Sequence, residues 1–72
     1  MPMRSNDLVR RLNRRATRMG VEHIETEAKG SHLKVRHGGR MAVVPMHRGD
    51  LPMGTYRSIL KQLGLTERDL ED

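Results

Sequence analysis

Four histidines are the side chains of this sequence best suited to acid–base chemistry, and one of them stands in a distinctive setting. His32 follows Gly30 and Ser31, and basic residues recur at alternate positions after it, at Lys34 and Arg36. The imidazole ring titrates near neutral pH, so it can both take up and release protons there. Neighbouring cations stabilise the negative charge that develops in a transition state. The combination suits cleavage of a phosphodiester.

RNA carries its own nucleophile, the 2′-hydroxyl, so a histidine can promote its cleavage without a metal ion by moving protons. The expected reaction is a metal-independent transesterification that leaves a 2′,3′-cyclic phosphate. No cofactor is expected, and the histidines are too scattered in the sequence to predict a zinc site. The second proton-transfer group stays open among four candidates: His47, Tyr56, Glu25 and Glu27.

Length and charge narrow the class of protein. The chain has 72 residues, which predicts one domain over residues 1–72, and it contains no cysteine that could form a disulfide. Lysine and arginine number 14 against 9 acidic residues, giving a formal net charge of +5. This excess favours a polyanionic partner, with nucleic acid ahead of a membrane surface. A single aromatic residue excludes base-stacking platforms, so contacts to RNA would be made mostly with its backbone.

No apolar run is long enough to cross a bilayer. The stretch Met1–Arg18 contains arginines throughout and has no apolar core, so we expect no secretory signal. The sequence therefore predicts a cytoplasmic protein without a membrane partner.

The first element expected is an amphipathic helix that begins with Ser5 or Asn6 as its cap and ends at Met19, before Gly20. Its apolar stripe has helical spacing and comprises Leu8, Val9, Leu12, Ala16 and Met19. Arginines cover the rest of its surface, either as a solvated face or as RNA contacts: Arg10, Arg11, Arg14, Arg15 and Arg18. The six methionines are expected to fill the core.

Three strands should follow, over Val21–Ala28, Ser31–His37 and Met41–Val44. The middle one alternates, with Leu33 and Val35 on one side and His32, Lys34 and Arg36 on the other. The Gly38-Gly39 pair is typical of a tight hairpin, and Pro45 should end the last strand.

After a loop over Met46–Met53, Thr55 should cap a second helix that stops at Gly64. Its apolar face would consist of Tyr56, Ile59, Leu60 and Leu63. A short acidic segment, Glu67–Asp72, follows, with Leu70 packed back onto the core. The expected fold is α+β: a three-stranded antiparallel sheet in the order α-β-β-β-α, with two helices on one face.

Several pieces of this sequence, taken in order, resemble the HicA family of toxins. They are Gly30-Ser31-His32, Gly38-Gly39-Arg40, Val44-Pro45-Met46-His47, and the stretch from Gly54 to Leu65, Gly-Thr-Tyr-Arg-Ser-Ile-Leu-Lys-Gln-Leu-Gly-Leu. Together they span about Lys29 to Leu65, and an amphipathic first helix stands where the family has one.

The resemblance implies a fold like the double-stranded-RNA-binding domain and ribosome-independent cleavage of mRNA by a toxin of a type II toxin–antitoxin system. His32 matches the family's catalytic histidine. A HicB-like antitoxin would mask the active site, and the toxin alone would be a monomer. Candidate RNA-binding residues are Lys29, Ser31, Lys34, Arg36, Arg57 and Lys61.

Two other functions fit the basic surface. A non-catalytic double-stranded-RNA-binding module would need the same charge and fold, but it would have no use for the Gly-Ser-His motif. An interaction protein could instead dock its arginine-rich helix onto an acidic partner. For a toxin both kinds of contact can hold, because its antitoxin must cover a cationic surface.

Overall fold

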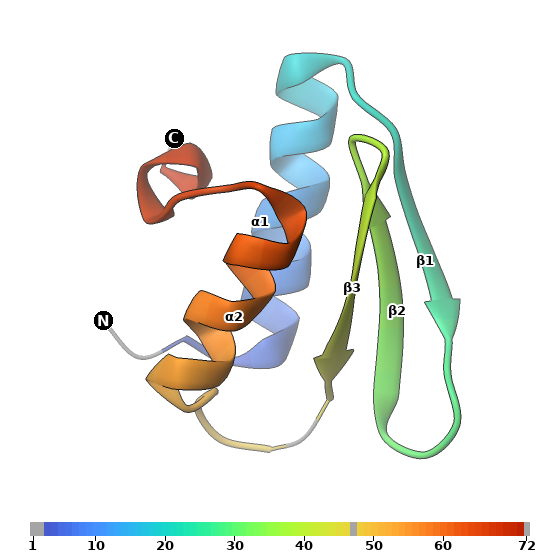
Figure 1. Cartoon of the computed structure of the whole chain (residues 1–72), viewed down its shortest axis with the longest axis vertical. Coiled ribbons are helices and arrows are strands. Elements are labelled where there is room, and N and C mark those ends of the chain that lie inside the picture. Colours follow the sequence, from blue (N-terminus) through green and yellow to red (C-terminus); the bar gives the residue numbers. More distant parts are fainter. Residues whose placement is uncertain (1–2, 47, 72) are drawn as a thin grey trace.

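The chain folds as a helix, three strands and a second helix, followed by one short 3₁₀ helix (Figure 1). The computed structural model describes residues 3–46 and 48–71. The elements are α1 (Ser5–Met19), β1 (His23–Glu27), β2 (His32–His37), β3 (Arg40–Pro45), α2 (Met53–Leu63) and η1 (Glu67–Leu70). The predicted α-β-β-β-α order is confirmed.

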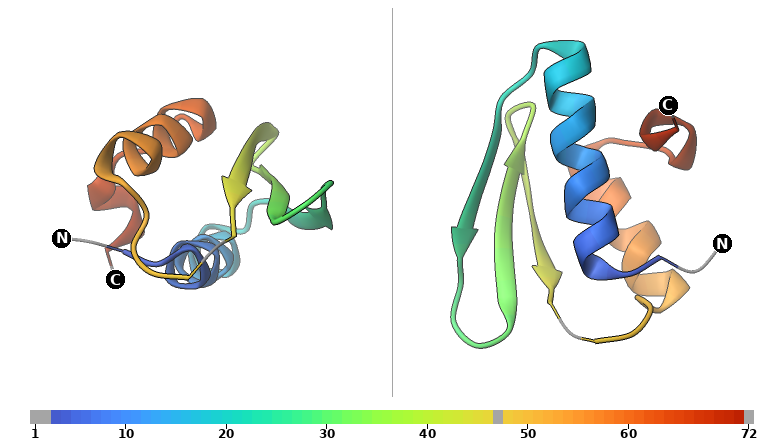
Figure 2. Two further views of the ribbon diagram at one scale, coloured as in Figure 1. Left: turned by 90° about the horizontal axis from the view of Figure 1, so that it is seen from below. Right: turned by 180° about the vertical axis from the view of Figure 1, so that it is seen from behind.

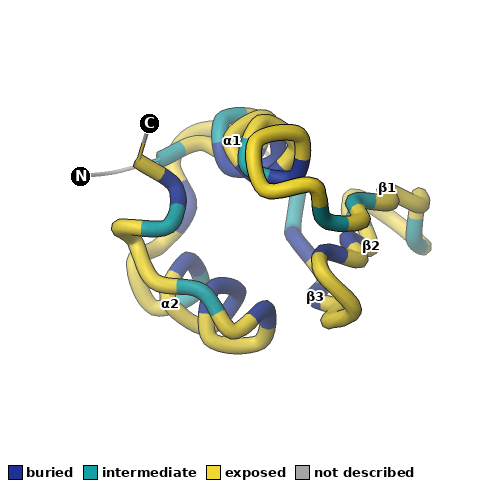
Figure 3. Tube along the Cα trace, turned by 90° about the horizontal axis from the view of Figure 1, so that it is seen from above, coloured by how far each residue is buried: buried dark blue, intermediate teal, exposed yellow. Residues whose placement is uncertain are grey.

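The strands form one antiparallel sheet in the order β1-β2-β3, so β2 is central. Figure 2 shows α1 and α2 side by side on the same side of this sheet. Figure 3 shows buried segments on α1, α2 and the sheet where these elements face one another, and a further one near the C-terminus. The other side of the sheet carries no helix among the described residues. We call that side the open face.

Strict alternation along β2 separates the two faces. Val35 and His37 are buried toward the helices, and Leu33 is half-buried on the same side. His32, Lys34 and Arg36 alternate with them and are exposed on the open face. The pairing places Ile24, Met41 and Val43 on the open face as well, next to the basic residues of β2.

The core is formed where α1 and α2 pack on β2 and β3. Its members are Leu8, Val9, Leu12, Val35, Ala42, Val44, Leu51, Tyr56, Ile59, Leu60, Leu63 and Leu70. Leu70 packs back as predicted. Met19, however, is 56% exposed, so its predicted place in the apolar stripe is wrong. The prediction that methionines fill the core also fails for Met41 and Met53, which are exposed.

Both helices begin without the side-chain caps that the sequence indicated. The residue before α1 is Arg4, and the residue before α2 is Pro52; neither helix has a capping side-chain hydrogen bond. Ser5 is instead buried, and its Oγ donates a hydrogen bond of 2.6 Å to the carbonyl oxygen of Pro45. The hydroxyl thus joins the start of α1 to the end of β3. Thr55 lies inside α2 rather than at its start.

The predicted glycine stops are confirmed. Gly20 and Gly64 adopt left-handed backbone angles, with φ of 68° and 71°, which glycine reaches without steric cost. Gly64 is more crowded, because a Cβ there would lie 3.0 Å from Nε of Arg40. The Arg40 side chain therefore lies across the C-terminal end of α2, where the helix dipole favours a cation.

These two glycines make a matched pair for a stability test. Each replacement by alanine should lower the free energy of unfolding by about 1–2 kcal/mol through left-handed backbone strain. Gly64→Ala should cost more than Gly20→Ala, because only Gly64 faces Arg40 and nothing lies within 4 Å of a Cβ at Gly20. Urea unfolding of both variants measures the difference. In an Arg40→Ala background the two costs should become equal; a persisting excess would contradict the role given to Arg40.

A polar network replaces apolar packing between α1 and β1. Arg15 Nη1 lies 2.9 Å from Nε2 of His37, whose Nδ1 lies 3.2 Å from Nδ1 of His23. Nε2 of His23 in turn lies 2.8 Å from Oε2 of Glu25. The His37 residue is only 2% exposed. The chain of contacts runs from a cation on α1 to a carboxylate on β1.

Only one pair of tautomers satisfies every contact. The guanidinium of Arg15 can only donate, so Nε2 of His37 must accept and Nδ1 of His37 must carry the proton. Nδ1 of His23 then accepts, and its Nε2 donates to Glu25. Both rings are neutral in this arrangement. Burial, the charge of Arg15 and the neighbouring His23 all lower the pKa of His37, which keeps its ring neutral.

This lowered pKa predicts a loss of stability in mild acid. The unfolded chain takes up a proton at the ordinary histidine pKa, whereas the folded chain resists it, so the stabilisation is present above about pH 6.5. It is lost as the pH falls from there toward the lower pKa of folded His37. The thermal unfolding midpoint should therefore drop between about pH 7.5 and about pH 5.5.

The drop should be smaller in His37→Gln, which removes the buried titrating ring. Replacing the exposed His32 with glutamine should leave the drop as it is in the unmodified protein. If His37→Gln and the unmodified protein lose stability equally over this pH range, the network does not control the acid sensitivity.

Candidate active site

His32 is the first residue of β2 and presents its side chain on the open face, exposed to solvent. Its backbone is fixed on both sides. The carbonyl oxygen of His32 accepts a hydrogen bond from the amide of Ala28 at 3.0 Å, and its pairing partner in β3 is Pro45. Gly30 turns the chain just before it with a φ of 75°. The ring is thus held on a fixed backbone and open to a large substrate.

Several predicted RNA-binding residues share this end of the sheet. Lys29 and Ser31 are exposed in the turn between β1 and β2, immediately before His32. Lys34 follows two positions later on the same face. Arg36 is also on the open face, but it follows His32 by four residues along β2, which corresponds to about 13 Å. Its guanidinium faces Glu22 with an Nε–Oε1 separation of 3.6 Å.

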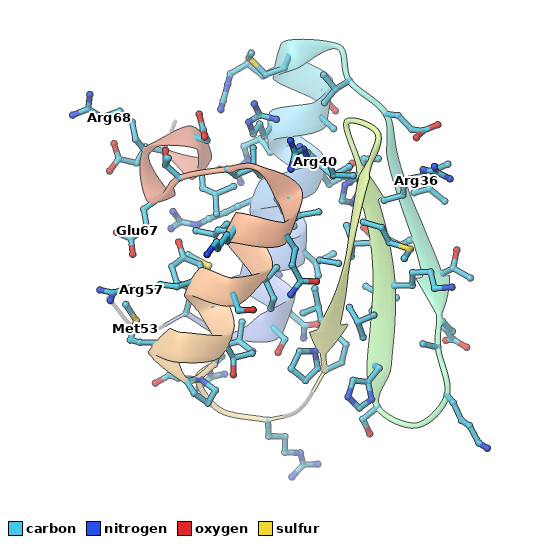
Figure 4. The ribbon with its side chains drawn as sticks, in the orientation of Figure 1. Arg36, Arg40, Met53, Arg57, Glu67 and Arg68 are labelled. Carbon is cyan, nitrogen blue, oxygen red and sulfur yellow. The ribbon has the colours of Figure 1, made fainter. Side chains whose placement is uncertain are left out.

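The structure does not bring Arg57 and Lys61 to His32. Both are exposed on α2, one turn apart, beside a shallow hollow that also includes Leu60 and Leu65. Figure 4 shows Arg57 on the opposite side of the molecule from Arg36. A single RNA strand lying on the open face would not reach them.

The four candidates for a second proton-transfer group lie in different parts of the chain, and three of them are among the described residues. Tyr56 is buried in the core, and burial together with the charge of Glu67 raises its pKa, so it is remote and a weak acid. Glu25 and Glu27 pair with Val35 and Leu33, which places them on the helix side of the sheet. His47 lies outside the described residues. None of the first three shares a face with His32.

The arginines of α1 are partly structural, which the sequence did not indicate. Arg15 donates to the buried His37, as described above. Arg18 Nη2 donates to the carbonyl oxygen of Asp69 at 3.1 Å and so joins α1 to η1. Arg10 lies 3.7 Å from Asp7 on the exposed side of the helix. These arginine side chains therefore do not form a uniform RNA-binding face on α1.

A pocket next to His32 contains basic residues that sequence reasoning missed. We call it the basal pocket; its lining residues are Arg4, Asn6, Ser31, Met46, Arg48 and Gly49. Arg4 precedes α1, and Arg48 follows β3. No local pattern links residues this far apart in the sequence, so only the fold could reveal them.

The chemistry available at this site is proton transfer beside cations. His32 supplies an accessible imidazole, and Lys34 a neighbouring ammonium group on the same face. The site is part of a surface, which fits a polymer better than a small molecule. Among residues 3–46 and 48–71, no group of three or more acidic, histidine or cysteine side chains is placed to hold a metal ion. The helices described here are also too short or too polar to span a bilayer.

Comparison with known proteins identifies the family. No curated protein matches the sequence closely enough to count as a relative. A family model described as the HicA toxin of bacterial toxin–antitoxin systems matches residues 9–65, from within α1 to just past the end of α2. The match covers most of the chain, including the strand that carries His32 and its pairing partners. The chain therefore belongs to the HicA family and is a toxin of a toxin–antitoxin system.

Proposed function

We propose that the protein is a ribosome-independent endoribonuclease that cleaves mRNA in the cytoplasm, with His32 as its catalytic residue. The observation that carries this proposal is the exposure of the Gly-Ser-His histidine on the open face, within the segment matched by the toxin family. A toxin must act on something the cell needs, and the positive charge of the chain suits RNA. The membership in the family supports a nuclease in general, and the geometry of His32 supports this particular chemistry.

The proposed reaction needs no metal. The 2′-oxygen of a ribose attacks the adjacent phosphorus, the bond from phosphorus to the 5′-oxygen breaks, and the 2′-proton leaves as the 5′-oxygen gains one. His32 would carry out one of these two proton transfers, and a bound water could serve the other. Lys34, on the same face, would stabilise the extra negative charge on phosphorus. The products are a 2′,3′-cyclic phosphate and a 5′-hydroxyl.

Replacing His32 with alanine should reduce RNA cleavage by about 10²–10⁴-fold, the usual contribution of a positioned proton-transfer group. The purified variant and the unmodified protein are compared on a short single-stranded RNA, with a chelator present, and the product ends are identified. Because the ring is exposed, thermal unfolding of the variant should be unchanged.

Gln62→Ala serves as the control, since this exposed side chain donates a hydrogen bond to Ser58 within α2 and lies away from the open face. It should cleave RNA at the normal rate. Products with 3′-hydroxyl ends, or a requirement for a divalent ion, would refute the mechanism. RNA binding without cleavage by the unmodified protein would favour the alternative, a non-catalytic double-stranded-RNA-binding module.

We further propose that a HicB-like antitoxin covers the open face. Three large apolar side chains are exposed there: Ile24 at 48%, Met41 at 52% and Val43 at 42%. Ile24 and Met41 pair with Arg36 from its two sides, and Val43 pairs with Lys34, so the surface is both apolar and basic. Such a patch on a small protein commonly marks a protein contact. A partner with apolar and acidic residues would fit it and would also block His32.

The double variant Met41→Gln/Val43→Thr should weaken the complex with the cognate antitoxin by roughly tenfold or more, because apolar groups at the centre of an interface dominate its affinity. RNA cleavage by the free toxin should persist. Binding is measured by titration calorimetry with the purified antitoxin.

The matched control is Met19→Gln/Met53→Gln, which removes two exposed methionines from the helices instead. It should bind the antitoxin normally. If both double variants bind the antitoxin equally weakly, the open face is not the specific contact.

A further inference from the structure

The basal pocket lies at one end of the sheet, where three parts of the chain meet. Its lining residues come from the start of α1, from the turn before β2, and from residues 46, 48 and 49 after β3. Hydrogen bonds hold these segments together. Besides the Ser5–Pro45 hydrogen bond, the amide of Met46 donates to the carbonyl oxygen of Ser31, and the amide of Leu51 donates to that of Met3 at 2.7 Å. These bonds hold the start of α1 and the turn before β2 against the end of β3.

The charge of this pocket differs from that of a second groove, on the helix side of the molecule. Arg4 and Arg48 are the charged residues that line the basal pocket, and no acidic side chain of the described residues lines it. The groove between α1, α2 and η1 also contains arginines, but its lining is neutralised by Asp7, Glu67 and Glu71. Of the basal pocket and this groove, only the basal pocket has charged lining residues that are all positive. Such a lining favours an anion.

The polar groups of the pocket match a phosphate. Arg4 makes no side-chain hydrogen bond or ion pair among the described residues, so its guanidinium is available to a ligand. The Ser31 hydroxyl and the Asn6 amide add neutral hydrogen-bond donors. The pocket also lies at the start of α1, whose dipole adds to the attraction of the Arg4 guanidinium for an anion.

We propose that the basal pocket binds a backbone phosphate of the RNA strand whose neighbouring linkage is cleaved at His32. This inference rests on the proposed ribonuclease function and extends it to a substrate subsite. Ser31 lines the pocket and directly precedes His32, so their α-carbons are about 3.8 Å apart. An RNA strand that passes His32 on the open face would continue around the end of the β-sheet into the pocket. Holding a flanking phosphate there positions the reactive linkage against the imidazole.

The test measures RNA binding separately from cleavage. In a His32→Ala background, which keeps the RNA intact, the double variant Arg4→Ala/Arg48→Ala is titrated with a short single-stranded RNA at several salt concentrations. The affinity for RNA should fall roughly tenfold or more. A plot of the logarithm of this affinity against the logarithm of the salt concentration should also become shallower, by about 0.7 for each phosphate that the variant no longer neutralises. The charge-preserving variant Arg4→Lys/Arg48→Lys should retain most of the affinity.

The control Arg40→Ala/Arg68→Ala removes the same charge elsewhere. Figure 4 shows Arg40 near the tip of the β2–β3 hairpin and Arg68 on η1, away from this end of the sheet. It should change RNA affinity little. An equal fall in affinity in the two double variants would overturn the proposal, because only overall charge would then matter. Unchanged RNA binding together with weakened antitoxin binding would also overturn it and make the pocket a protein contact.

The subsite and the nuclease function can fail independently. Normal cleavage by Arg4→Ala/Arg48→Ala in a protein that keeps His32 would refute the subsite and leave the nuclease intact. No cleavage by the unmodified protein, together with specifically weakened RNA binding in that double variant, would refute the nuclease and support the phosphate site.

Discussion

The alternation of side chains along β2 is the constraint on which the rest of the molecule depends. Burying Val35 and His37 under the helices forces His32, Lys34 and Arg36 onto the open face, since successive side chains of a strand point to opposite sides. A slip of one residue would exchange the two sets and bury the candidate catalytic ring. The two-glycine hairpin at Gly38 and Gly39, both with positive φ, fixes the register of β2 against β3.

Much of the fold was predictable because its signals are local. The apolar spacing of α1, the alternation of β2 and the Gly-Gly turn each act within a few residues. The elements they predict are confirmed, although Met19 does not belong to the buried stripe of α1. The predictions of the helix caps were wrong because the contact that decides one of them is not local. Ser5 has the right chemistry for a cap, but its hydroxyl finds a partner at Pro45, 40 residues away. Nothing in the neighbouring sequence reveals such a contact.

The same distinction applies to the candidate site. His32 and Lys34 lie within one strand, so their common face follows from the sequence alone. The basal pocket combines residues from distant parts of the chain, and Arg15 contacts His37 across 22 positions. An arginine on a helix surface gives no sign of whether it faces solvent or a buried ring. The count of charged residues therefore indicated a basic protein correctly, but it did not show which arginines of α1 make structural contacts.

The polar network beneath β1 has a consequence for how this sheet comes apart. The helix-facing side of β1 carries His23, Glu25 and Glu27, and no residue of β1 is among the buried core of the described chain. Its attachment depends on hydrogen bonds to β2 and on the contacts of two neutral imidazoles, with little apolar surface removed from water. Partial opening of a protein begins where few buried apolar contacts hold a segment. The outer strand should therefore detach and exchange its amide protons well before the hairpin of β2 and β3, which the helices hold.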